Sequence, residues 1–411
     1  MVVGVKRVVA GALIVALGLS GCTPAASGPG TAPNQHGPAQ TTTSGADTPS
    51  ETSGSMTAPT APTASETTRF TLREEASFDD PWAMAFLPGA RQALITLRTG
   101  TLLLYDLDTG EQTIITGTPQ PVVAGQGGLG DVAISPTFAT DHTIYLSWVE
   151  AGEGGTSGAV VGRGRLETGA TTILTDLTVV WRQQPKVTGS GHFGHRLLFS
   201  PDGRYLFVSS GERQKFDPAQ DLTTNLGKIL RLNPDGTPAA GNPFADRAGV
   251  TKEIWSYGHR NPLGLAFDAS GNLWESEMGP MGGDEINLIL PGRNYGWPKA
   301  SNGSNYDGTD IPDHTPSDGF EPPKAWWNPS ISPANLMIYT STRFPAWTGD
   351  AFVGGLSGQA LIRIHLDGTS ATIADTWQLG HRIRAVTQGP DGSIWLLEDG
   401  AGARLLELVP A

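Results

Sequence analysis

The stretch that decides the fold is residues 197–210, LLFSPDGRYLFVSS. Two apolar runs flank a Pro-Asp-Gly turn, and Asp and Gly both tolerate the positive φ angles of a tight hairpin. Each run is short and rich in residues that favour buried strands. The stretch therefore predicts two antiparallel strands joined by a tight turn.

This hairpin is one copy of an internal repeat. Five further copies begin at Met84, Val132, Leu265, Leu336 and Val386. The copy at Leu336 is the weakest, because no turn residue follows its first strand. Six similar units, each with room for two more strands, predict an all-β fold, a six-bladed β-propeller. Two packed sandwiches are the alternative, but they would not need six similar units.

Two strand-like segments lie at the ends of the repeat region, residues 69–75 and 404–409. We expect them to pair in one blade and close the ring, because closure removes the open sheet edges. The domain is accordingly predicted to span residues 68–411.

The N-terminal segment predicts export and lipidation. A basic pair, Lys6 and Arg7, precedes an apolar run that ends in the lipobox Leu-Ser-Gly-Cys at residues 19–22. The run is too short to span a membrane. We predict a lipoprotein signal peptide over residues 1–21 and a mature N-terminus at Cys22 that carries acyl chains such as palmitate. An ordinary secretory signal is the alternative, but Cys22 is the only cysteine in the 411 residues.

Residues 22–67 are rich in Thr, Pro, Ser, Gly and Ala and contain almost no large apolar residues. Such a segment cannot bury enough surface to offset the entropy of ordering, so we expect a disordered tether after the lipidated Cys22. A glycosylated stalk has the same composition. The lipid anchor would hold the domain at the membrane in the cell envelope, outside the cytoplasm.

Composition also excludes several kinds of site. With Cys22 acylated, the domain has no thiol for a disulfide, a thiolate metal site or a cysteine nucleophile. The formal net charge is −13 and no basic run follows the signal, so nucleic acid is not an expected partner.

Polar motifs gather in the loops, mostly just before the first strand of a repeat. They are GQGGLGD (125–131), GHFGHRL (191–197), YGHRNP (257–262), SEMGP (276–280), GGDEIN (282–287), RNYGWP (293–298) and RIR (382–384). Loops in equivalent positions of a propeller lie on one face around the central channel, so the motifs should meet at one rim.

This ordered set of motifs resembles that of the soluble glucose dehydrogenases and aldose sugar dehydrogenases that use pyrroloquinoline quinone (PQQ), over essentially all of residues 70–410. The resemblance implies oxidation of an aldose at C1 to the lactone, with electrons passed to an acceptor in the envelope. It implies that His192 is the general base, a role that suits an imidazole because it is largely unprotonated at neutral pH. It also implies that Arg260 and Asn261 contact the quinone oxygens, with Arg260 stabilising charge on the reduced cofactor.

The same resemblance implies further cofactor contacts. Gln126, Arg382 and Arg384 match polar contacts to PQQ and its carboxylates, which arginine can bind in a bidentate way. The backbone carbonyls of Gly279 and Pro280 match the ligands of a Ca²⁺ ion that would polarise the quinone.

Two positions depart from the family pattern. Ser357 stands where many relatives have a lysine that pairs with the cofactor, and Gly191 stands where the glucose dehydrogenases have an acidic residue. Both changes remove charge from the expected binding site and bear on its affinity for the cofactor.

Simpler interpretations remain open for single residues. His192 could be a rim histidine bonded to backbone, and with His195 it forms an H-x-x-H pair. Arg382 and Arg384, at i and i+2, face one side of a strand and could both take part in structural salt bridges with an acid. The pair Trp326–Trp327 suits packing as well as sugar stacking.

The function also has alternatives. One is a non-catalytic propeller lipoprotein that binds a carbohydrate or a protein partner, because propellers host many unrelated functions. Another is a lactonase-like propeller with Ca²⁺ in its channel, which would require a cluster of acidic ligands there.

Overall fold

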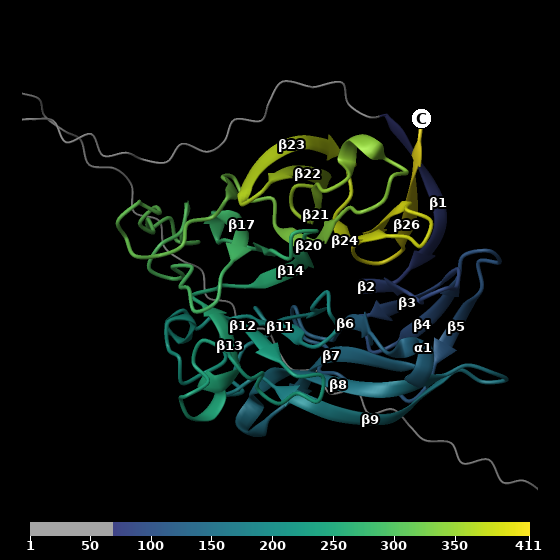
Figure 1. Ribbon diagram of the computed structural model, residues 1–411, viewed down its shortest axis with the longest axis horizontal. Coiled ribbons are helices and arrows are strands. Elements are labelled where there is room, and N and C mark those ends of the chain that lie inside the picture. The colour runs from purple at the N-terminus through teal and green to yellow at the C-terminus, as the bar shows by residue number, and fades with distance from the viewer. Residues whose placement is uncertain (1–68) are drawn as a thin grey trace, which may run out of the picture. The chain divides into compact units, whose positions relative to one another are not determined.

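A computed structural model describes residues 69–411, and these residues form six four-stranded antiparallel sheets arranged around a ring (Figure 1). The fold is thus a six-bladed β-propeller, as the repeats predict. The predicted signal peptide, Cys22 and the tether lie outside the described residues. Within the part that is described, no helix is long and apolar enough to cross a membrane.

Each blade runs outward from its first-named strand. Blade one consists of β2 (Pro81–Phe86), β3 (Gln92–Leu97), β4 (Leu102–Asp106) and β5 (Gln112–Ile115). Blade two consists of β6 (Leu129–Ile134), β7 (Thr143–Ala151), β8 (Ser157–Glu167) and β9 (Ile173–Arg182). Blade three consists of β10 (Gly194–Phe199), β11 (Leu206–Ser210), β12 (Lys228–Leu232) and β13 (Ile254–Tyr257).

Blade four consists of β14 (Pro262–Phe267), β15 (Leu273–Glu277), β17 (Asp284–Ile289) and β19 (Ala325–Trp327). Blade five consists of β20 (Pro333–Ile338), β21 (Ala351–Gly355), β22 (Ala360–Asp367) and β23 (Ser370–Gln378). Blade six consists of β24 (Ile383–Gln388), β25 (Ile394–Glu398), β26 (Ala403–Pro410) and β1 (Phe70–Phe78). A small ribbon pairs β16 (Met281–Gly282) with β18 (Gly303–Ser304). The described helices are α1 (Phe138–Asp141) and the 3₁₀ turns η1 (Glu153–Gly155), η2 (Asp217–Ala219), η3 (Gly249–Glu253) and η4 (Pro345–Trp347).

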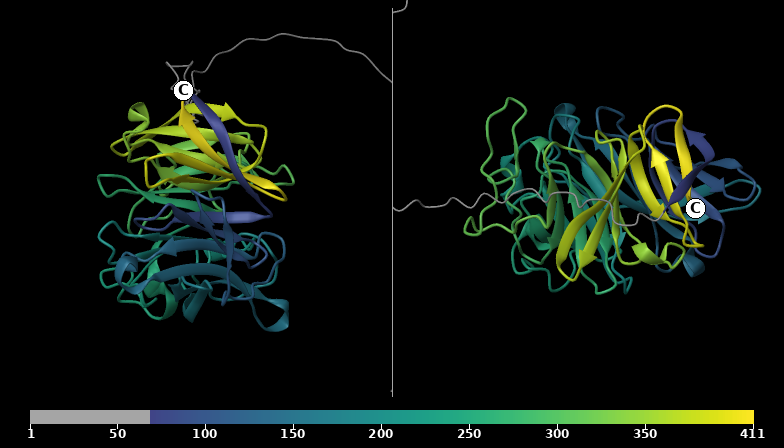
Figure 2. Two further views of the ribbon diagram at one scale, coloured as in Figure 1. Left: turned by 90° about the vertical axis from the view of Figure 1, so that its right-hand side faces the viewer. Right: turned by 90° about the horizontal axis from the view of Figure 1, so that it is seen from above.

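The ring closes as the sequence predicts, through pairing of the first strand with the last. Strand β1 lies antiparallel to β26 from Phe70 opposite Pro410 to Phe78 opposite Ala403, and Figures 1 and 2 draw the two strands side by side. Phe70 then packs edge-on against Trp377 of the fifth blade, with ring centroids 5.3 Å apart. Closure therefore joins the two ends of the domain by hydrogen bonds, and Phe70 also packs the closing strand against the neighbouring blade.

The six sequence repeats are the innermost strands of the six blades. Repeats starting at Met84, Val132, Leu197, Leu265, Leu336 and Val386 fall in β2, β6, β10, β14, β20 and β24. Each of these strands contacts the innermost strand of the next blade, and β24 returns to β2. Even the weak copy at Leu336 occupies the expected place, because burial between neighbouring blades and not the turn chemistry holds it there.

Every innermost strand begins with an irregularity of register. In blades three, four and six, the shifts lie between Gly194 and Leu197, between Pro262 and Gly264, and between Ile383 and Ala385. A β-bulge bends the strand and re-aims its side chains. The bulges therefore sit where the polar motifs enter the sheets and turn those motifs toward the ring axis.

Candidate functional site

A cavity of about 390 Å³ opens among the loops that precede the innermost strands. Four of the predicted cofactor contacts line it, namely Gln126, Asn261, Arg382 and Arg384. Gly279 and Arg260 line a smaller adjacent void, and Met278 borders both spaces. The residues of the predicted rim site thus surround two adjoining spaces that share Met278, and they come from at least four blades.

His192 is 4% exposed and does not itself line this cavity, but it directly precedes Phe193 and Gly194, which do. Its ring Nδ1 lies 2.5 Å from Glu212 Oε1, and its backbone N–H donates to Gln126 Oε1 at 2.7 Å. Nε2 makes no hydrogen bond to any described residue. The bonding of Nδ1 to a carboxylate fixes the ring and leaves the Nε2 lone pair for chemistry.

The charge state of this pair follows from its surroundings. Burial lowers the pKa of the His192 imidazole, and this outweighs the hydrogen bond to Glu212, which raises it. Burial would raise the pKa of Glu212, but hydrogen bonds from His192 and from the backbone N–H groups of Lys215 and Phe216 lower it overall. A neutral imidazole beside an ionised carboxylate is the state expected at neutral pH.

Asn261 connects the third and fourth blades at the cavity wall. Its Oδ1 accepts a hydrogen bond from Gly194 N at 3.2 Å, while its Nδ2 donates to no described residue. Gly211 passes so close that a Cβ there would lie 2.2 Å from His192 O and 3.0 Å from Asn261 Oδ1. Glycine at this position allows the two loops to meet.

Arg260 lies between the buried Trp297 and the exposed Tyr306. Its guanidinium lies 5.1 Å from the Trp297 ring centroid, and Nη2 donates to the Tyr306 hydroxyl at 3.2 Å. Nη1 donates to the carbonyls of Met278 and Gly279, both at 2.9 Å, while the buried Nε has no partner. The predicted Ca²⁺ ligand Gly279 O is therefore already an acceptor for Arg260 in this arrangement.

Arg382 and Arg384 enter the cavity from the sixth blade and share one carboxylate. Arg382 Nε donates to Asp399 Oδ2 at 2.7 Å, and Arg384 Nε donates to Asp399 Oδ1 at 2.8 Å. The salt-bridge interpretation is thus correct for both residues, yet both also line the cavity. Arg98 adds a third guanidinium to the lining, with Asp80 3.6 Å away.

The two departures from the family pattern have local structural partners. A Cβ at Gly191 would lie 2.7 Å from Gln214 Cδ, so the Gln214 side chain fills the space of any larger residue. Ser357 Oγ lies 2.8 Å from Ser332 Oγ, and Ser332 lines the cavity. Position 357 is therefore beside the cavity, without contributing a charge to it.

Comparison with known proteins places this geometry in a family. The family model described as glucose/sorbosone dehydrogenase matches residues 78–407. The chain belongs to the glucose/sorbosone dehydrogenase family. It is 41% identical over 340 residues to the aldose sugar dehydrogenase YliI of Escherichia coli K12, which covers 81% of this chain and 90% of that protein.

Solved structures of family members have the same propeller. The soluble aldose sugar dehydrogenase from Escherichia coli, in its apo form, matches with a TM-score of 0.79 and 40% identity over 84% of this chain and all of that one. The PQQ-bound aldose sugar dehydrogenase from Streptomyces coelicolor matches with a TM-score of 0.70 and 32% identity, over 84% and 99% of the two chains.

Sequence reasoning missed the acids that hold the site residues of this glucose/sorbosone dehydrogenase family member. In three blades a carboxylate stands at or just after the end of the second strand. Glu212 holds His192, Glu277 accepts from the backbone N of Arg260, and Asp399 holds both arginines. In each hairpin, the end of the second strand lies opposite the loop that precedes the first strand. An acid at the end of a second strand was therefore the sequence signal that could have identified these residues.

Other open alternatives also resolve. His195 Nδ1 bonds to Ser147 Oγ at 2.8 Å and its ring stacks on Trp82, so it does not share a metal site with His192. Trp327 packs against the apolar core of blades four and five. The H-x-x-H pair and this tryptophan therefore have structural partners of their own.

Proposed function

We propose that this protein oxidises an aldose at C1 to the lactone, with PQQ bound in the 390 Å³ cavity and His192 as the general base. The observation that carries the proposal is the His192–Glu212 pair, a buried neutral imidazole with its Nε2 free, next to a cavity lined by arginines. The known relatives support the class of reaction, because they are named aldose sugar and glucose dehydrogenases.

The residues present fit a flat, carboxylated quinone. Three guanidinium groups line the cavity, and so does Asn261, whose Nδ2 donates to no described residue. The buried Nε of Arg260, beside the adjacent void, has no partner. Trp82 adds a large aromatic face to the lining. A buried donor without a partner is costly unless a ligand satisfies it, so these atoms favour an oxygen-rich guest.

The chain's own residues would perform three tasks in the reaction. Bound PQQ would supply the hydride acceptor. His192 Nε2 would take the proton from the sugar C1 hydroxyl, while Glu212 stabilises the imidazolium that forms. Arg260 would place positive charge beside the site where negative charge develops. Tyr306, which is exposed and lines the cavity, offers a face on which a sugar ring could lie.

Calcium at the carbonyls of Gly279 and Pro280 stays a prediction. Arg260 occupies Gly279 O as a donor, so a cation at that oxygen requires the guanidinium to move. No step of the proposed reaction depends on the ion. The envelope electron acceptor and lipid anchor are likewise proposals that rest on the sequence.

The experiment is a titration of PQQ into the purified protein, with and without Ca²⁺, followed by dye reduction with a panel of aldoses. Saturable binding is expected, with turnover that falls by about 10² or more in His192→Ala while PQQ binding persists. A folded protein that binds no PQQ would overturn the proposal and favour the non-catalytic alternative, since Asp399 already neutralises part of the arginine charge.

A further inference from the structure

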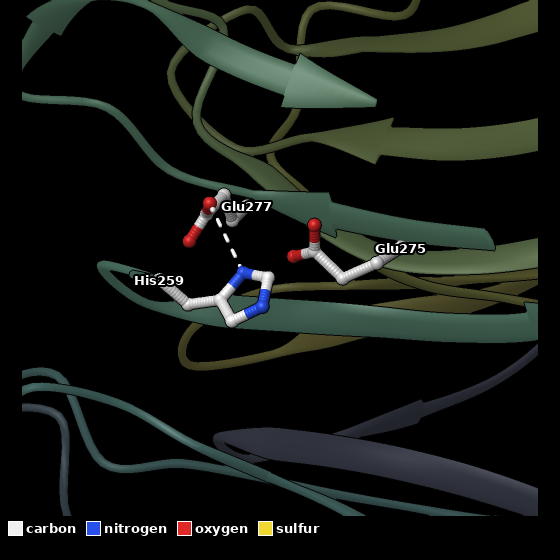
Figure 3. A group of neighbouring side chains, drawn as sticks. All are labelled: His259, Glu275 and Glu277. Carbon is white, nitrogen blue, oxygen red and sulfur yellow. Dashed lines mark ion pairs between the residues drawn. The ribbon is translucent and has the colours of Figure 1, made fainter. Parts of the chain in front are cut away.

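The fourth blade contains a second group of convergent side chains, His259, Glu275 and Glu277, which the proposed reaction does not use. Figure 3 shows the imidazole and both carboxylates pointing toward one another. One ligand atom from each residue lies within 4.8 Å of the others. All three side chains are buried, with exposures of 0%, 0% and 4%.

His259, Glu275 and Glu277 each keep one side-chain nitrogen or oxygen without a hydrogen bond, and that atom could bind a shared ligand. Glu277 Oε2 accepts from Arg260 N at 2.7 Å, and Glu275 Oε2 accepts from Asn287 Nδ2 at 3.0 Å. The opposite oxygen of Glu275 is buried without a partner, and so is His259 Nδ1. His259 Nδ1 lies 3.5 Å from Glu277 Oε1, too far for a good hydrogen bond.

The contacts of the His259 imidazole are those expected of a histidine that binds a metal. His259 Nε2 lies 2.8 Å from Ser256 Oγ and the ring stacks on Tyr295, so the ring is held from two sides. A ligating histidine commonly bonds through its other nitrogen in this way, which fixes the tautomer and aims the free lone pair. With Nε2 as the donor to Ser256, the bare Nδ1 faces a carboxylate oxygen.

The cluster also gathers acids without a basic side-chain partner. Among the described residues, no Lys or Arg side chain forms an ion pair with Glu275 or Glu277. Glu285 lies close enough that Asn287 Nδ2 bonds to it and to Glu275, which adds a third buried acid. Burial raises the pKa of Glu275 well above its ordinary range, and the charge of Glu277 adds to this. Uncompensated carboxylates of this kind are costly.

We propose that His259, Glu275 and Glu277 bind one divalent transition-metal ion of the Zn²⁺ or Mn²⁺ class. Ligands about 2.1 Å from a tetrahedral ion stand about 3.4 Å apart, close to the 3.5 Å between His259 Nδ1 and Glu277 Oε1. The imidazole selects against Ca²⁺, which prefers oxygen ligands alone. The site is distinct from the predicted Ca²⁺ at Gly279, and it does not rest on the proposed dehydrogenase activity.

The ion would brace the floor of the candidate active site. Glu277 would join the metal through one oxygen and hold the backbone N of Arg260 through the other. Metal binding would thus fix the turn that carries Arg260 and Asn261.

The test uses chelator-treated full-length protein, titrated with ZnCl₂, MnCl₂ and CaCl₂ separately by calorimetry, with bound metal counted by mass spectrometry. One equivalent of Zn²⁺ or Mn²⁺ is expected, together with a rise in Tm. His259→Gln and Glu275→Gln should each weaken binding at least tenfold. Glu253→Gln is the matched control, because Glu253 is a partly buried acid held by Trp181 and Asn225 outside the cluster.

Two further readouts separate a metal site from a merely structural cluster. Co²⁺ bound to the wild-type protein should give a visible absorption spectrum that His259→Gln alters. Glu275→Gln should leave the metal-free protein folded, because a neutral amide replaces a carboxyl whose pKa burial already raises, while abolishing the Tm gain on adding metal. Two results would overturn the proposal. One is the absence of a stoichiometric Zn²⁺ or Mn²⁺ ion in the wild-type protein, and the other is binding by His259→Gln and Glu275→Gln that equals binding by the wild type.

Discussion

His192 Nδ1 and Glu212 Oε1 lie 2.5 Å apart, one hydrogen bond away from the cavity residue Gln126, although 20 positions separate them in the sequence. The β10–β11 hairpin brings them together, since Gly194 pairs with Ser210 across it. Glu212 in turn accepts from the backbone N–H groups of Lys215 and Phe216, so it is itself fixed. A base oriented by an anchored acid is the feature of this site that most directly predicts catalysis.

Glu212→Gln should therefore lower the rate of aldose oxidation by about tenfold or more, within the range that general-base catalysis contributes. The amide removes the charge that stabilises the imidazolium, and it also removes the influence that raises the pKa of His192. Because the base must be unprotonated, the acidic limb of the kcat/KM profile should move to lower pH.

The control for this change is Glu150→Gln, a partly exposed acid that pairs with Arg182 and Lys186 away from the cavity. Its rate and pH profile should match the wild type. A Glu212→Gln enzyme with a reduced rate but an unmoved acidic limb would mean that Glu212 acts through folding and not through His192.

Ser357→Lys should tighten PQQ binding by about tenfold, because a charged hydrogen bond contributes about 1.5 kcal/mol or more. Ser357 stands beside Ser332 at the cavity edge, so a longer side chain can reach the lining. The gain should shrink at high ionic strength. Ser357→Met, with similar length and no charge, should give no gain, and an equal gain in both variants would contradict the charge argument.

Much of this architecture could be predicted from the sequence because the repeats mark the strands that are buried most deeply. The copies at Leu197 and Val386 lie in innermost strands, and the motifs before them reach the cavity. Strand ends lead to the rim in every blade, so motif position alone predicts convergence.

What the sequence did not predict depends on pairing across each hairpin. Glu212 and Asp399 belong to no recognised motif, and Glu277 lies in the SEMGP motif without an assigned role. Their roles follow from register, since Pro262 pairs with Glu277, and Ile383 with Glu398, next to Asp399. Local bulges shift that register at the start of each innermost strand, which a pattern of apolar residues does not reveal.

Gly191→Asp, which introduces the acid that the family resemblance places there, should destabilise this protein by about 1 kcal/mol or less, because the exposed Gln214 side chain can move aside. A Cβ at this position would lie 2.7 Å from Gln214 Cδ. Gln214→Ala should be mild alone and should recover much of the loss in the double variant. Urea unfolding of the four proteins measures the coupling, and purely additive effects would contradict the packing explanation.

Acid should destabilise the propeller in part through His195, a buried histidine that is neutral in the folded state. Burial lowers the pKa of His195 to about 3, whereas an unfolded histidine titrates near 6.5. Between these values the unfolded chain binds the extra proton, so the contribution of His195 to stability is complete above pH 6.5 and declines as the pH falls toward 3.

His195→Asn should therefore reduce the pH dependence of the unfolding free energy in this window by up to about 1.4 kcal/mol per pH unit. Asn suits the site because His195 has a φ of 55°, which Asn tolerates better than most residues. His142→Asn is the matched control, since His142 is exposed and has a φ of 54°. Urea unfolding at pH 7, 6, 5 and 4 gives the slopes, and an unchanged slope in His195→Asn would mean that His195 is protonated in the folded protein.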